Sequence, residues 1–120
     1  MKKLTKDDVL KIEDRAQEMF EVPEWGGAVP LRAPDAWQQS EYQQGLLEIT
    51  SDNKGNIKTK PNMLGANVRL CALGIADEDG PWFTVEQLKT KSPQAINRIA
   101  ERLRVISGLD AGAQEEAEGN

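Results

Sequence analysis

The side chains that carry most enzyme chemistry are scarce in this sequence. It contains no histidine and one cysteine, Cys71, so neither a Ser-His-Asp nor a Cys-His catalytic arrangement can be built within the chain. The same shortage removes the usual nitrogen and sulfur ligands of zinc. Cys71 lies in the apolar run RLCALGI, which predicts a small buried core residue, and the lack of a disulfide partner favours a reducing compartment.

Carboxylates and glycines are the remaining groups with catalytic or binding potential. The 20 acidic residues lie mostly in charge-dense segments, where nothing would shift their pKa values. Gly26 and Gly27 lack the lysine and following hydroxyl residue of a phosphate-binding loop. The run DEDG at 77–80 lacks the alternating ligands and distal glutamate of a calcium loop, and it predicts a turn that ends a helix. We therefore expect a protein that is not an enzyme and that holds no metal or cofactor.

Length and charge narrow the classes of partner. A chain of 120 residues fits one domain, and its net charge of −5 disfavours a general binder of nucleic acid or of anionic membranes. No apolar run approaches the roughly 20 residues of a transmembrane helix, and the N-terminus becomes charged too early for a signal peptide. These features predict a cytoplasmic protein that contacts neither nucleic acid nor membrane.

One basic region leaves an alternative open. Residues 84–106 predict a short helix, a tight connection and a longer helix that carries Arg98, Arg102 and Arg104, with Lys89 and Lys91 before it. This order loosely resembles a helix-turn-helix, so a small DNA-binding regulator is the alternative function. Rows of arginines on one helix face are more often solvated surface, and the acidic C-terminal tail counts against DNA.

Most of the chain has helical patterns. We expect helices at about 5–19, 34–48, 62–75, 85–90 and 93–107. The last is the clearest, because Ile96, Ile99, Leu103 and Ile106 repeat at helical spacing and Gly108 follows as a stop. The predicted fold is therefore mainly α, a single helical domain over 1–109, with an acidic, flexible tail at 110–120.

Two stretches depart from the helical pattern. EVPEWGGAVPLR predicts a β-ribbon at about 20–32, in which Gly26 and Gly27 adopt positive φ at the turn. Trp25 beside that turn either covers the core of its own domain or contacts another chain. The polar run TSDNKGNIKTKPN is either a loop or a second small hairpin around residues 53–55, and its composition favours the loop.

The order of these motifs resembles the tail assembly chaperones of long-tailed, siphovirus-like bacteriophages. The first block that carries the resemblance consists of Val22, Pro23, Glu24, Trp25, Gly26, Gly27, Val29, Leu31 and Arg32. The second consists of Arg69, Asp77, Asp79, Gly80, Phe83 and Thr84, and a helix ending in a polar tail follows. The resemblance covers about residues 5–109; the departures are the basic run at 50–62 and the helix start at Ala33-Pro34.

This resemblance implies a mainly helical chaperone that binds the tape measure protein, keeps it soluble and helps to recruit tail tube subunits. It also implies that the protein self-associates and acts together with a longer form made by translational frameshifting. The resemblance further implies that the protein is found in the host bacterial cytoplasm and not in the mature virion. A structural virion subunit is a third, weaker option. The candidate partner-binding residues are Trp25, Gly26, Gly27, Trp37, Trp82 and Phe83.

Overall fold

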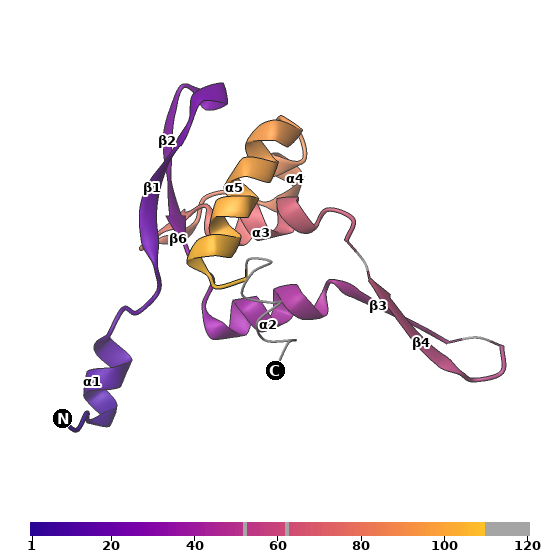
Figure 1. The fold of residues 1–120 in the computed structure, drawn as a ribbon, viewed down its shortest axis with the longest axis horizontal. Coiled ribbons are helices and arrows are strands. Elements are labelled where there is room, and N and C mark those ends of the chain that lie inside the picture. The colour runs from indigo at the N-terminus through magenta and orange to yellow at the C-terminus, as the bar shows by residue number, and fades with distance from the viewer. Residues whose placement is uncertain (52, 62, 110–120) are drawn as a thin grey trace.

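The computed structural model describes residues 1–51, 53–61 and 63–109 (Figure 1). In chain order the elements are α1 (Lys6–Lys11), β1 (Gln17–Val22), a 3-10 turn (Pro23–Trp25), β2 (Gly27–Arg32), α2 (Ala36–Gln44), β3 (Leu47–Ser51), β4 (Ile57–Pro61), α3 (Ala66–Gly74), β5 (Ala76–Asp77), β6 (Gly80–Pro81), α4 (Val85–Leu88) and α5 (Pro93–Ile106). Within these ranges there are five α-helices and three two-stranded antiparallel sheets. The fold is therefore mixed α/β. The prediction of a mainly α fold with one hairpin was wrong because it contained too little strand.

Helix α5 lies at the centre of the core. Ser92 caps its first turn and Pro93 occupies the first helical position, where the predicted helix begins. Three residues of the predicted apolar stripe, Ile96, Ile99 and Leu103, are buried, while Ile106 is half-buried at the edge of the core. They pack with buried residues of α3 and of the β1–β2 ribbon, so the predicted inward face of this helix is confirmed.

The β1–β2 ribbon is present but longer than predicted. Its strands cover 17–32 rather than 20–32, with Phe20 opposite Val29 and Val22 opposite Gly27. Gly26 has the expected positive φ of 75°, whereas Gly27 does not, so the prediction for Gly27 was wrong. Since the chain alternates sides from Gln17 onward, it cannot continue the helix predicted for 5–19, and α1 ends at Lys11.

A second hairpin occupies the segment that we expected to be a loop. Strands β3 and β4 pair from Leu47–Pro61 to Ser51–Ile57, and Gly55 in the connection has a positive φ of 81°. The residues from Leu47 onward therefore belong to a paired strand and not to a loop. For the same reason α2 does not reach residue 48: it ends at Gln44, and β3 begins three residues later.

Helix boundaries elsewhere differ by a few residues. Helix α3 begins at Ala66 rather than at 62, so Leu64 lies before the helix and is 89% exposed. Asp35 is the N-cap of α2 and not a first-turn residue, because its side chain accepts from the backbone of Gln38. The DEDG turn closes the small β5–β6 hairpin, in which Gly80 has φ 113°. The tail predicted as flexible, 110–120, lies outside the described residues.

Two segments project from the core. Figure 1 shows α1 standing away on one side, beyond the β1–β2 ribbon, and the β3–β4 hairpin extending on the other. The radius of gyration is 17.1 Å. A compact chain of this length would have a radius near 14 Å, so much of the molecule's extent lies in these projections.

Candidate functional site

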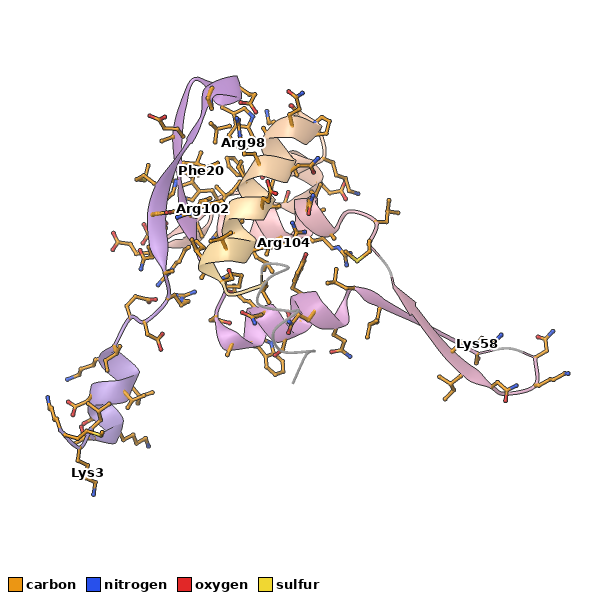
Figure 2. All side chains as sticks on the ribbon, in the orientation of Figure 1. Lys3, Phe20, Lys58, Arg98, Arg102 and Arg104 are labelled. Atoms are coloured by element: carbon orange, nitrogen blue, oxygen red, sulfur yellow. The ribbon has the colours of Figure 1, made fainter. Side chains whose placement is uncertain are left out.

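The arginines of the predicted basic region pair with the β1–β2 ribbon. Arg98 of α5 forms an ion pair with Glu24, and Arg102 forms one with Glu18, with Nη2 of Arg102 2.9 Å from Oε2 of Glu18. Figure 2 shows these arginines projecting from α5 toward the ribbon. Hydrogen bonds from the guanidinium groups hold the pKa of Glu18 and of Glu24 below their usual range.

These pairs remove the support for the DNA-binding alternative. A helix that reads DNA presents its basic side chains to the phosphates and the groove. Here Arg98 and Arg102 contact carboxylates of their own chain, and Arg104 donates to Asn67 of α3. These three arginines of α5 thus pair within their own chain.

The sequence-predicted aromatic residues do not gather into one surface. Trp25 is half-buried and packs against the core, which favours the first of its two interpretations. Trp37, at the start of α2, is 73% exposed. Gly26 and Gly27 lie at the tip of the ribbon, where they line a small pocket with Glu21, Pro23 and Ala28. Trp37 is therefore the most exposed of the four aromatic candidates.

Trp82 and Phe83 form a corner beside the β5–β6 hairpin. Their rings meet edge to face, with centroids 6.2 Å apart and planes at 76°. Phe83 is half-buried against the core, and the indole Nε1 of Trp82 donates to Asp77 Oδ2 at 2.9 Å. That hydrogen bond lowers the pKa of Asp77. Trp82 remains about half exposed, and it is held in a fixed orientation.

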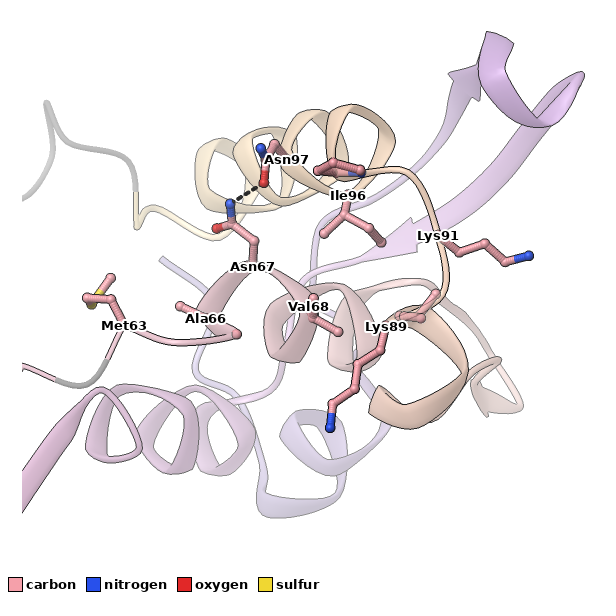
Figure 3. Close-up of a pocket in the computed structure, with 11 residues that line it drawn as sticks. Met63, Ala66, Asn67, Val68, Lys89, Lys91, Ile96 and Asn97 are labelled. Atoms are coloured by element: carbon pink, nitrogen blue, oxygen red, sulfur yellow. Dashed lines mark hydrogen bonds between the residues drawn. The ribbon is translucent and has the colours of Figure 1, made fainter.

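An open groove lies between the start of α3 and the α4–α5 connection. Its volume is about 580 Å³. It is lined by Met63, Gly65, Ala66, Asn67, Val68, Leu88, Lys89, Lys91, Pro93, Ile96 and Asn97. Figure 3 shows Met63 at one end, the two lysines at the other, and the hydrogen bond from Asn67 Nδ2 to Asn97 Oδ1, 2.7 Å, between them. The groove therefore combines apolar and polar lining with a positive end, and we refer to it as the α3–α5 groove.

Cys71 contributes no chemistry to this groove. It is fully buried in α3, its Sγ lies 3.4 Å from the carbonyl oxygen of Ile96, and burial raises its pKa to about 12. A thiol with such a pKa is neither a nucleophile nor a metal ligand at neutral pH. In the ranges that the structure describes, no group of three or more candidate ligand residues could hold a metal ion, and no helix is long and apolar enough to cross a membrane.

The sequence analysis missed both the groove and the ion pairs. The signal for one pair was present, because Glu18, Phe20 and Val22 alternate and must share the inward face of β1. A glutamate on that face needs a cation from the element beneath, and α5 offers a row of arginines. The groove has no comparable signal, since its lining comes from three separate segments.

Comparison with known proteins identifies a shared fold. No protein-family model matches the chain, and no curated protein matches it. Among solved structures, that of the bacteriophage HK97 tail assembly chaperone matches with a TM-score of 0.53 and 24% identity, over 80% of this chain and 85% of that chain. The chain thus has the fold of the bacteriophage HK97 tail assembly chaperone.

Proposed function

We propose that this protein is a phage tail assembly chaperone without catalytic activity. In this role it binds the tape measure protein, keeps it soluble and helps to recruit tail tube subunits. It self-associates and acts beside a longer frameshifted form, in the host cytoplasm and outside the mature virion. The observation that carries the proposal is the fold shared with the HK97 tail assembly chaperone over most of both chains.

Two properties of the surface suit that role. A tape measure protein is a long helical chain whose apolar faces lie uncovered until the tube encloses them, so a chaperone must cover them reversibly. The net charge of −5 favours a soluble complex. Exposed aromatic side chains such as Trp37 and Trp82 offer contact area to an apolar helix face, and tryptophan is the residue type most enriched at binding hot spots.

Co-expression with the tape measure protein of the same phage or prophage genome tests the proposal. We expect the tape measure protein to move from the pellet to the soluble fraction, with several copies of this protein co-purifying. Trp37→Ala should lower the co-purified amount, whereas Gln43→Ala, an exposed change on the same helix, should not. A tape measure protein that stays insoluble with both the short and the longer form present would contradict the assignment.

A further inference from the structure

The α3–α5 groove carries cations and no acidic residue among its lining residues. Its charged side chains are Lys89 and Lys91, and both are exposed. Lys89 pairs with Glu86, which does not line the groove, whereas Lys91 has no carboxylate partner among the described residues. Arg104 adds a third cation beside the groove, because it donates to Asn67 in the lining. Charge complementarity therefore favours an acidic segment as the occupant of this groove.

The end of α5 directs the chain aside at a fixed point. Gly108 has φ 75°, and its N–H donates to the carbonyl oxygen of Val105. The N–H of Leu109 donates to the carbonyl oxygen of Arg104 at 2.7 Å. These two bonds form a Schellman motif, which ends the helix and prevents the chain from continuing along its axis. Leu109 is buried, so the residues that follow it leave the core beside Arg104.

The next residues of the sequence, 110–120, have the charge and the reach that this groove calls for. They contain Asp110, Glu115, Glu116 and Glu118 and no lysine or arginine. Three alanines among them can contact the apolar part of the lining. Helix α5, with 14 residues, is about 21 Å long, whereas the residues from 110 to 118 span up to about 30 Å when extended. This tail can therefore reach from the end of α5 to the lysines before its start.

We propose that residues 110–120 dock in the α3–α5 groove of their own chain, with their carboxylates paired to Lys89, Lys91 and Arg104. The tail then acts as a displaceable cover of the groove. Ion pairs exposed to water are individually weak, so an acidic segment of a partner can compete for the same lysines. The contact goes beyond the proposed function, because it requires neither a tape measure protein nor a second copy of the chain.

Labelling of an introduced thiol by N-ethylmaleimide tests this cover on the full chain. Met63→Cys places the thiol in the groove, where Met63 is 57% exposed. Figure 3 shows Met63 at the end of the groove away from Lys91, so a tail that comes from the end of α5 passes it before reaching the lysines. The native Cys71 is buried with its pKa raised to about 12, and it should not react. Ile57→Cys on the β3–β4 hairpin is the matched control, since Ile57 is 74% exposed.

Three sets of charge changes are compared in each thiol variant. They are a neutral tail (Glu115→Gln, Glu116→Gln, Glu118→Gln), a reversed groove (Lys89→Glu, Lys91→Glu), and the reversed groove combined with a reversed tail (Glu115→Lys, Glu116→Lys, Glu118→Lys). The reagent is uncharged, so these changes alter its access to the thiol and not its attraction to the protein. The groove lysines are exposed, so circular dichroism should show an unchanged fold.

We expect the neutral tail and the reversed groove each to raise the labelling rate of Met63→Cys about fivefold, because each exposed ion pair shifts an equilibrium by about twofold. Sodium chloride at about 1 M, which screens charges beyond about 3 Å, should raise the rate of the unaltered tail in the same way. Reversing the tail as well as the groove should restore protection. The rate of Ile57→Cys should stay constant in every case.

Two results would overturn the proposal: a Met63→Cys labelling rate that neither the charge changes nor salt alters, or a reversed tail that restores no protection to the reversed groove. Protection that increases with protein concentration would also overturn it, because the tail would then occupy the groove of a second copy. These measurements use the purified protein alone. A groove that is open in the full chain would therefore refute the cover and leave the chaperone assignment to the co-expression test.

Discussion

Helices α3 and α5 approach each other closely where Gly74 faces Leu103. A Cβ built on Gly74 would lie 2.4 Å from Leu103 Cδ2, so the leucine side chain rests directly on the backbone of α3. Leu103 is also fully buried. Leu103→Ala removes three carbons, worth about 2.4 kcal/mol of transfer free energy, and leaves a cavity that the helix backbone cannot readily fill. We therefore expect a loss of about 3–4 kcal/mol in the free energy of unfolding, within the range seen for buried leucines.

The converse change probes the same contact. Gly74→Ala inserts a methyl group into occupied space and should cost about 1–3 kcal/mol through overpacking. Gly74 does not have a positive φ, so alanine adds no backbone strain there. In the double variant the new methyl group enters the space that Leu103 has left. The double variant should therefore lose less free energy of unfolding than the sum of the two single-variant losses, by about 1 kcal/mol or more.

Urea denaturation followed by circular dichroism measures all four proteins of this cycle. Val105→Ala is the control on the same helix, because Val105 is half exposed, and it should change the free energy of unfolding by less than about 0.5 kcal/mol. If Leu103→Ala also changed the free energy of unfolding by less than about 0.5 kcal/mol, the apolar stripe of α5 would not lie in the core. Additive losses in the double variant would show that Gly74 and Leu103 do not touch.

Three further outcomes are expected. Gly26→Val should lower the free energy of unfolding by about 1–2 kcal/mol, because Gly26 has φ 75°. Gly27→Val should change it little, since Gly27 does not have a positive φ and no atom lies within 4 Å of a Cβ added there. Arg15 and Arg32 lower the pKa of Glu13 from 4.5 to about 2. The stabilising effect of Glu13 should therefore be present above pH 4.5 and vanish as the pH falls through about 2. Comparing the melting temperatures of the wild type and Glu13→Gln across that range checks this. Fluorescence anisotropy should detect no binding to duplex DNA at physiological salt, and a sequence-specific complex at nanomolar protein would overturn the chaperone assignment.

The elements with strong local signals were predictable from the sequence. Helix α5 has a proline start and an apolar repeat on one face, and its predicted and observed bounds agree within one residue. Helix α4 has a capping box of Thr84 and Gln87, whose spacing can be seen in the sequence. At the ribbon, the two glycines identified the turn, although only Gly26 needs positive φ. In each case the residues that specify the element lie within a few positions of one another.

The remaining elements depend on contacts that the sequence does not display. Residues 12–20 fit a helical stripe as well as an alternating strand, and the pairing of Phe20 with Val29 decides for the strand. The β3–β4 hairpin has polar, turn-rich composition, which local propensity cannot distinguish from a loop. The groove arises only when α3 packs beside α4 and α5, so no single segment predicts it.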